Sequence, residues 1–377
     1  MKKILIHYPF IPIYRVPIFN EFGRNQKFKH LVIAPELFHD KTFHFDKTKY
    51  LFNWSKSHSH HFSILGRGID IEWGILSNLW AHRAKGSCYV ILSNPNILSS
   101  WLYSICARIL GYKVVFWGHG LIKKDTGITR FIRKLYYSLA DHFWLYGNDA
   151  IPLMRDIGIS DDKLSVIYNS LDYEVQRKLR EKLTNQKEII KTELGIDQNE
   201  KVIVSMGRLL EKIRLDQGVN GIHKIINSEP NVKLVVIGDG PEKDSLIALT
   251  KELDIESKVL FVGAIYNESD IARYYTIADV SIVMGRVGLS AMHSLAYGVP
   301  LITHDNLEEH CPEVEAIVPG ETGEFFQENN IDSFVCVLLK LLKNSSNYRN
   351  NCVSMIEDKY TPSKQMEFIE ESLSRIK

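Results

Sequence analysis

The chain has 377 residues, of which 45% are hydrophobic, 24% charged and 11% aromatic. A single hydrophobic core stops growing at roughly 250–300 residues, so this length predicts two domains, and the composition excludes wholesale disorder. The formal net charge is only +1, which gives no support to nucleic-acid binding as the main function.

The chain begins with two lysines and an apolar run, MKKILIHYPFIPIYRVPIF. We interpret Lys3–Tyr8 as a buried strand and not as part of a signal peptide, because prolines interrupt the run and no small-residue cleavage site follows. No apolar stretch approaches the roughly 20 residues that span a bilayer. The five cysteines are odd in number and scattered, which is typical of free thiols in a reducing cytoplasm. We therefore expect a cytoplasmic protein, with the inner face of the cell membrane as a second option.

Short apolar runs alternate with amphipathic segments through the rest of the first half. The further predicted strands are Leu31–Ala34, Tyr89–Ser93, Val114–Trp117, His142–Tyr146 and Leu164–Ile167. Helices are predicted at Ser99–Leu110, which Gly111 follows, and at Ile128–Leu139. This alternation predicts a parallel sheet with helices on both faces.

The segment from Tyr173 to Glu200 is almost entirely polar, so we interpret 173–200 as a linker with a solvent-facing helical part. The alternation then restarts. The predicted strands are Lys201–Met206, Val232–Gly238, Val259–Val262, Val280–Val283 and Pro300–Thr303, and the predicted helices are Leu215–Ile226, Lys243–Leu253 and Thr361–Ile376. We expect an α/β fold with Rossmann-like domains at 1–172 and 201–360. A final helix at 361–377 could cross back to the first domain. Two such domains facing a cleft would bind a ligand at the carboxyl ends of their strands.

Basic residues follow the strand Lys201–Met206. The strand ends in Gly207-Arg208, and Lys212 comes four residues later. The guanidinium of an arginine at this edge of a sheet suits a bidentate grip on phosphate oxygens, and a lysine adds a point charge. The alternative is that both are surface residues of an ordinary βα turn.

The next strand ends in Gly238-Asp239-Gly240-Pro241. Two glycines in such a turn allow positive φ and a close approach of the backbone, although a plain tight turn explains them equally well. The chain has neither a G-x-G-x-x-G fingerprint nor a P-loop. A nicotinamide or ATP cofactor therefore has no motif behind it.

A third segment, from Gly285 to Pro300, combines a glycine-containing loop with a helix that begins near Leu289. Free amides at the start of that helix form an anion site, which would face Arg208 and Lys212. His293 lies one turn further and can point the same way. It could equally be a histidine packed beneath the helix.

In the first half, His119 stands between two glycines at the end of a predicted strand. Glycines that flank a histidine have no evident packing use, which favours a functional role for His119. Tyr14 and Arg15 follow the first strand, where Arg15 could meet an acceptor or cap a helix. The group His58, His60 and His61 has no cysteine or carboxylate at ligand spacing, so we expect no metal site there.

Taken together, these segments resemble glycosyltransferase family four, whose members have the GT-B fold of two facing Rossmann-like domains. The resemblance covers the second half and, more weakly, the first. It rests on Gly207–Leu209, Gly238–Pro241, Ala278–Val280, Gly288–Pro300, Pro312-Glu313, Gly320–Gly323 and the boundary-like segment Tyr168–Asp172.

Two departures from the family pattern stand out. The family usually has Glu, seven residues, then Glu, and here the matching positions are Gly285 and His293. The first family glutamate contacts the transferred sugar and the second contacts the ribose. The position of the family lysine is Ile213, so either Lys212 or Arg214 could supply the charge. Because Gly285 cannot hold hydroxyls, the donor sugar could be a deoxy or otherwise modified hexose, while His293 can still hydrogen-bond the ribose.

The resemblance implies transfer of a hexose from a nucleoside diphosphate to a saccharide or lipid-linked saccharide, in glycan synthesis, with retention at the anomeric carbon. It also implies that the departing diphosphate is stabilised without a metal or cofactor. The residues that it marks are His119, Arg208 and Lys212 for catalysis; Gly207, Gly238, Gly240, Ile265, Gly285, Val287, Gly288, Leu289, Ser290 and His293 for the donor; and Tyr14 and Arg15 for the acceptor.

Two other functions stay open on the sequence alone: a nucleotide-sugar epimerase, and a degenerate protein that binds nucleotide sugars without turnover. The basic cluster Lys123, Lys124, Arg130, Arg133 and Lys134 could contact anionic headgroups of a membrane. It could also be a solvated helix face.

Overall fold

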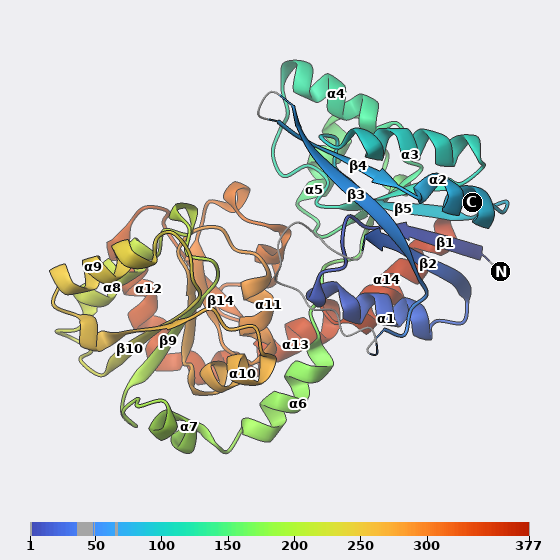
Figure 1. The fold of residues 1–377 in the computed structure, drawn as a ribbon. Coiled ribbons are helices and arrows are strands. Elements are labelled where there is room, and N and C mark those ends of the chain that lie inside the picture. Colours follow the sequence, from blue (N-terminus) through green and yellow to red (C-terminus); the bar gives the residue numbers. More distant parts are fainter. Residues whose placement is uncertain (1, 36–47, 49, 65–66, 377) are drawn as a thin grey trace. The chain divides into compact units, whose positions relative to one another are not determined.

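The computed structural model describes residues 2–35, 48, 50–64 and 67–376. The chain divides into two compact units, shown in Figure 1. The N-terminal unit comprises Met1–Leu171 together with Pro362–Lys377, and the C-terminal unit comprises Asp172–Thr361. Each unit is an α/β structure built on one sheet, as the alternating pattern of the sequence predicts.

The N-terminal unit contains an eight-stranded sheet in the order β4-β3-β2-β1-β5-β6-β7-β8. Neighbouring strands run parallel except β3 and β4, which are antiparallel. The strands are β1 (Lys2–His7), β2 (Phe28–Pro35), β3 (Trp54–Ile64), β4 (Arg67–Trp73), β5 (Cys88–Leu92), β6 (Lys113–Gly118), β7 (His142–Leu145) and β8 (Leu164–Val166). The inner strands are continuous apolar runs, as expected for a sheet that is covered on both faces.

Helices cover the two faces of this sheet in separate hydrophobic clusters. One cluster packs α2 (Ile75–His82), α3 (Leu98–Ile109), α4 (Gly127–Tyr137) and α5 (Ala150–Asp156) on one face. The other packs α1 (Val16–Arg24) and α14 (Pro362–Arg375) on the opposite face. The C-terminal helix α14 therefore belongs to the N-terminal unit, where Trp144 Nε1 donates to Ser372 Oγ at 2.8 Å.

The C-terminal unit contains a six-stranded parallel sheet in the order β11-β10-β9-β12-β13-β14. Its strands are β9 (Lys201–Met206), β10 (Val232–Ile237), β11 (Val259–Gly263), β12 (Val280–Val283), β13 (Leu301–His304) and β14 (Gly323–Phe326). Its longer helices are α8 (Leu215–Ile225), α9 (Lys243–Glu252), α10 (Glu268–Ile277), α11 (Leu289–Ala296), α12 (Ile331–Asn344) and α13 (Arg349–Lys359). Among the described residues, no helix is long and apolar enough to cross a membrane.

The polar segment at 173–200 forms α6 (Tyr173–Leu183) and α7 (Lys187–Glu193) rather than a solvent-facing linker. Leu183, Ile190 and Ile196 from this segment are buried in the core cluster of the C-terminal unit. Most of its charged side chains are exposed, apart from Lys191, which is buried and donates to Gln198 O and Glu200 O. The outward charges explain why the segment looks polar in the sequence.

The strand order of each sheet shows where a ligand is expected to bind. In the C-terminal unit the chain runs outward from β9 through β10 to β11 and then restarts at β12 on the other side of β9. The carboxyl ends of β9 and β12 therefore form a topological switch point, the usual ligand position in an open α/β sheet. In the N-terminal unit the corresponding point lies between β1 and β5.

Candidate functional site

The loops after β9 and β10 are joined directly through their backbones. Gly207 N donates to Ile237 O at 3.0 Å, and Leu209 N donates to Asp239 O at 2.9 Å. A Cβ atom on Gly238 would lie 1.9 Å from Gly207 O, and one on Gly240 would lie 2.2 Å from Leu209 O. Both glycines are therefore required by the contact between the two loops. This contact supports the backbone on either side of Arg208.

Gly285, directly after β12 and Met284, lies beneath the short turn Glu211–Ile213. A Cβ atom on Gly285 would lie 2.1 Å from Lys212 O and 2.9 Å from the Cα atom of Ile213. No side chain fits there unless the turn that carries Lys212 moves. The absence of a glutamate at this position is thus a packing requirement in this chain.

A buried histidine fixes the loop after Gly285. His310 Nδ1 accepts a hydrogen bond from Val287 N at 3.0 Å, and His310 Nε2 donates to His304 O at 3.0 Å. His310 is 2% exposed, and this burial lowers its pKa to about 4. The ring is therefore neutral, with its proton on Nε2, and it holds Val287 against the end of β13.

The helix α11 begins at this loop without a side-chain cap. Its N-cap is Gly288, and Ala291 N already donates to Gly288 O. Among the described residues, the amides of Gly288, Leu289 and Ser290 have no backbone or side-chain acceptor. Together with the helix dipole they form a site that favours an anion.

Three cations lie on the loops that follow β9 and β12. Arg208 and Lys212 are exposed and Arg286 is half-buried, and none of them forms an ion pair with a described carboxylate. The Nε atom of Arg286 is buried without a hydrogen-bond partner among the described residues. Such a desolvated and unpaired donor is costly unless a ligand completes it.

The thiol of Cys311 shows that two of these cations converge. Burial raises the pKa of this thiol and Glu313 adds to the effect, while Arg286 and Lys212 oppose it. The sulfur also lies 3.9 Å from where a Cβ atom of Gly288 would stand. Lys212, Arg286 and the start of α11 therefore share one neighbourhood. Arg286 was missed by the sequence reasoning, although it lies inside the glycine-containing loop.

Arg214 forms ion pairs with two carboxylates. Its guanidinium pairs with Glu328 at 2.6 Å and with Glu309 at 2.7 Å, and hydrogen bonding to Glu328 is the first cause of its raised pKa. Of the two residues that flank Ile213, Lys212 is the one left open to a ligand. Among the described residues, His304, Glu309 and Glu328 could by spacing hold a metal ion, but the Arg214 guanidinium bridges both carboxylates.

His293 lies in a polar cluster formed by three helices. Its Nδ1 atom is 3.2 Å from Gln176 Nε2 and 3.5 Å from Glu268 Oε1. Tyr297 donates to the same Glu268 oxygen at 2.8 Å, and Gln176 Nε2 lies 3.2 Å from it. Burial raises the pKa of Glu268, but hydrogen bonds from His293, Tyr297 and Gln176 outweigh it, so the net shift is downward. His293 is thus held by polar partners, and it is not a histidine packed among apolar groups alone.

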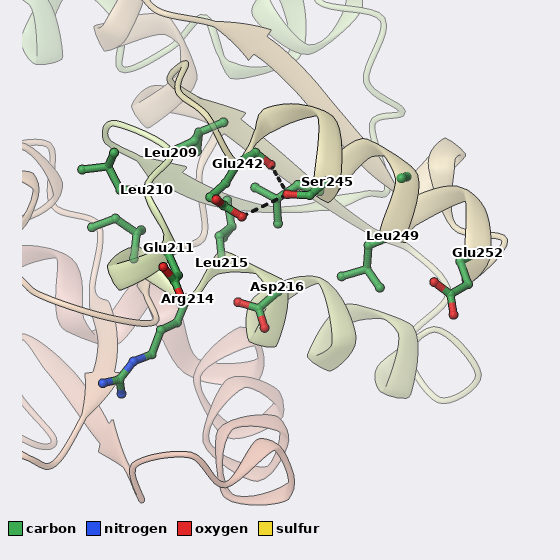
Figure 2. Close-up of a pocket in the computed structure, with 13 residues that line it drawn as sticks. Leu209, Leu210, Glu211, Arg214, Leu215, Asp216, Glu242, Ser245, Leu249 and Glu252 are labelled. Carbon is green, nitrogen blue, oxygen red and sulfur yellow. Dashed lines mark hydrogen bonds between the residues drawn. The ribbon is translucent and has the colours of Figure 1, made fainter.

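A hollow of about 530 Å³ lies on the other side of the β9 loop, between α8 and α9 (Figure 2). Its floor is apolar, with Leu209, Leu215 and Leu249, and its rim carries four carboxylates, those of Glu211, Asp216, Glu242 and Glu252. In Figure 2 Arg214 points away from these residues. Carboxylates would repel a diphosphate, so the hollow is a poorer anion site than the cationic start of α11.

The predicted residues of the N-terminal unit are distributed differently. His119 is half-buried, and its ring meets Tyr146 edge-on at 5.0 Å. Gly120 has φ +67, and a Cβ atom there would lie 2.9 Å from Leu145 Cδ2. Packing therefore explains why residue 120 is a glycine, so this glycine no longer supports a functional role for His119.

Arg15 is a core residue rather than an exposed one. It is 2% exposed and donates to Tyr8 Oη at 3.1 Å, Asn169 Oδ1 at 2.6 Å and Tyr146 Oη at 2.5 Å. Burial alone would lower its pKa, but the three surrounding tyrosines raise it overall. Only Tyr14 of the predicted acceptor pair is open to solvent.

Ile265 was predicted to contact the donor, and no metal site was expected at His58, His60 and His61. Ile265 packs half-buried against the core of the C-terminal unit. His58 is exposed on β3, and the side chains of His60 and His61 lie outside the described part of the chain.

Two Rossmann-like sheets of this kind are typical of the GT-B class. Solved structures of this class match the whole chain. HepE of Anabaena in complex with UDP gives a TM-score of 0.75 at 15% identity, covering 99% of this chain and 100% of the other. A glycosyltransferase from Rickettsia africae gives 0.76 at 14% identity, covering 100% and 98%. The predicted fold class is thereby confirmed.

A family model matches within the C-terminal unit. It is described as "Glycosyl transferases group 1" and covers residues 186–358. The predicted resemblance and enzyme class are confirmed at this level.

Curated relatives match over part of their length only. An N-acetyl-α-D-glucosaminyl L-malate synthase of Bacillus anthracis is 28% identical over 190 residues, 50% of this chain and 46% of the relative. An α-monoglucosyldiacylglycerol synthase of Streptococcus pneumoniae is 35% identical over 128 residues, 33% and 29% of the two chains. The matched part thus spans less than half of either relative.

Proposed function

We propose that the protein transfers a hexose from a nucleoside-diphosphate sugar to a hydroxyl of a saccharide or lipid-linked saccharide, with retention at the anomeric carbon. The observation that carries this proposal is the start of α11, where three uncapped amides lie near two cations without carboxylate partners, Lys212 and Arg286. A fold relative, HepE of Anabaena, has been crystallised with UDP and with UDP-glucose. The names of the curated relatives do not agree on one acceptor, so the acceptor is proposed only as a class.

The proposed chemistry is stabilisation of the departing diphosphate. As the bond to the anomeric carbon breaks, negative charge grows on the phosphate oxygens. Arg208, Lys212 and Arg286 would pair with these oxygens, and the amides of Gly288–Ser290 would donate to them. Because the glycine contacts and His310 hold the backbone that carries these groups, the loops need little reorganisation during the reaction. The residues present supply this stabilisation without any step that depends on a metal.

His293 is proposed to bind the ribose of the donor. Its Nδ1 atom is occupied by Gln176 and Glu268, so Nε2 is the ring atom that is left to hydrogen-bond a ribose hydroxyl. A carboxylate at this position would only accept. The donor sugar is proposed to be a deoxy or otherwise modified hexose, because Gly285 leaves no side chain to hold a hydroxyl. Strong preference for ordinary UDP-glucose in a donor screen would contradict this part.

The variant Arg208→Ala tests the phosphate site. Losing one preorganised donor to a charged oxygen costs about 2.7–4 kcal/mol in the barrier, so turnover should fall on the order of a hundredfold or more. Lys224→Ala is a matched control, since this lysine of α8 pairs with Asp332 of α12 and its loss should leave turnover unchanged. A folded Arg208→Ala protein with near wild-type turnover would refute the assignment.

Two assays separate this proposal from its competitors. Incubation of the donor without an acceptor would yield an isomerised donor if the protein were an epimerase. Binding of the donor in calorimetry without any turnover, over a panel of acceptors, would indicate a protein that only binds nucleotide sugars. A thermal-shift panel of nucleoside diphosphates would first identify the base, because ligand binding to the native state raises Tm.

A further inference from the structure

The outer surface of the N-terminal unit carries large apolar side chains on three neighbouring helices. On α4 they are Ile128, Phe131, Ile132 and Leu135; on α3 they are Leu98, Leu102, Ile105 and Ile109; and on α2 they are Leu76 and Trp80. All ten are exposed, with Ile109 at 78% and Ile128 at 76%. Exposed apolar residues are ordinary when scattered, but ten of them on three neighbouring helices indicate an interaction surface.

The spacing of these residues shows that each helix presents a stripe. The four residues of α4 are separated by three, one and three positions, and those of α3 by four, three and four, which places each set on one face of a helix. The opposite faces of the same helices are buried, with Tyr136 and Tyr137 of α4 and Tyr103 and Ala107 of α3 in one core cluster. The exposed stripes are therefore additional to the faces that hold the helices on the sheet (Figure 1).

The charge around the stripes is strongly positive. The segment from residue 98 to residue 137 contains seven lysines and arginines but only one acidic residue, Asp125, although the whole chain has a net charge of +1. Asp125 pairs with Arg133, and Asp156 pairs with Arg130 and Lys124. Lys123 and Lys134 are exposed and form no ion pair with a described residue. Both can therefore meet an external anion.

We propose that the outer face of α2, α3 and α4 docks on an anionic membrane surface. Apolar stripes flanked by lysines are the pattern that inserts into the boundary between headgroups and acyl chains, and each near-surface cation adds electrostatic attraction. Trp73 and Trp80 are exposed at 57% and 60% beside these helices, and tryptophan favours the level of the headgroups. A second copy of the chain fits less well, because a symmetric contact through this face would bring two basic segments together.

The test is flotation of the full-length protein with vesicles of phosphatidylcholine, alone or mixed with phosphatidylglycerol. The wild-type protein should float with the mixed vesicles, not with phosphatidylcholine alone, and its binding should weaken as salt is raised. The variants Phe131→Ser with Ile132→Ser, and Lys123→Glu with Lys134→Glu, should each bind at least about tenfold more weakly. The controls Ile189→Ser and Lys343→Glu, at exposed positions of the C-terminal unit, should bind like the wild type.

Three outcomes would overturn the proposal. The wild-type protein could fail to float with either vesicle, or float equally with both, or bind normally after both double substitutions. If light scattering shows a dimer that Phe131→Ser converts to a monomer while vesicles do not bind, the face is a contact between proteins. No donor is present in flotation, so the result is independent of whether the proposed transferase activity holds.

Discussion

Substituting alanine for Gly285 is the sharpest test of how the anion site is built. The added methyl group would lie 2.1 Å from Lys212 O, whereas real Cβ atoms essentially never come within 3.0 Å of such an atom. The turn Glu211–Ile213 must therefore move by about 1 Å, and Lys212 moves with it. Overpacking of this kind costs about 1–3 kcal/mol, which for a unit of this size lowers Tm by roughly 2–12 °C.

The assay combines thermal unfolding with donor kinetics. We expect Gly285→Ala to lower Tm and to reduce kcat, because a displacement of about 1 Å near reacting groups costs on the order of a hundredfold. Gly118→Ala is a suitable stability control, since a Cβ atom at Gly118 would meet only ordinary contacts of 3.9 Å with Ser93. A Gly285→Ala protein with unchanged Tm and unchanged kinetics would refute the close contact. Gly285→Glu should be at least as damaging, although it restores the residue that the family usually has.

Two further predictions concern the histidines. His310 has a pKa of about 4, below the ordinary 6.5, so the stability that it contributes is complete above pH 6.5 and is lost as the pH falls toward 4, by about 3 kcal/mol. His310→Gln should therefore lose less stability than the wild type between pH 7 and pH 4.5 in urea unfolding, and an equal loss in both proteins would contradict this. Glu268→Gln should weaken nucleoside-diphosphate binding about tenfold in calorimetry by releasing His293. Asp332→Asn on α12 serves as its control, and unchanged affinity of Glu268→Gln would show that Glu268 does not position His293.

Much of the fold follows from the sequence because the inner strands are short apolar runs between amphipathic helices. The predicted strand Lys201–Met206 has the bounds of β9, and the other central strands agree within a few residues. The strands β3 and β4 were not predicted, because β3 reads WSKSHSHHFSI and lacks an apolar run. The edge strand β14 was missed for a related reason, since it reads GEFF and also lacks an apolar run of strand length.

The site was predictable where it depends on local chain chemistry and not where it depends on distant contacts. The cations after β9 and the uncapped start of α11 are visible as residue types at strand ends. The burial of Arg15 is not, because its partners Tyr146 and Asn169 are 131 and 154 residues away in the chain. The same holds for His310, whose role becomes evident only from its bonds to Val287 and His304.

The two positions at which the family glutamates are absent have different physical explanations. At Gly285 the space of a side chain is taken by the backbone of the Lys212 turn, so the loss cannot be repaired by one substitution. At His293 another residue supplies a carboxylate: Glu268, at the start of α10, has an oxygen 3.5 Å from the ring. The group offered to a ligand changes accordingly, from a carboxylate to the Nε2 atom of an imidazole whose Nδ1 atom is held by Glu268 and Gln176. Donor recognition in this chain should therefore depart from the family pattern more at the sugar than at the nucleotide. The donor screen measures recognition of the sugar, and the Glu268→Gln titration measures recognition of the nucleotide.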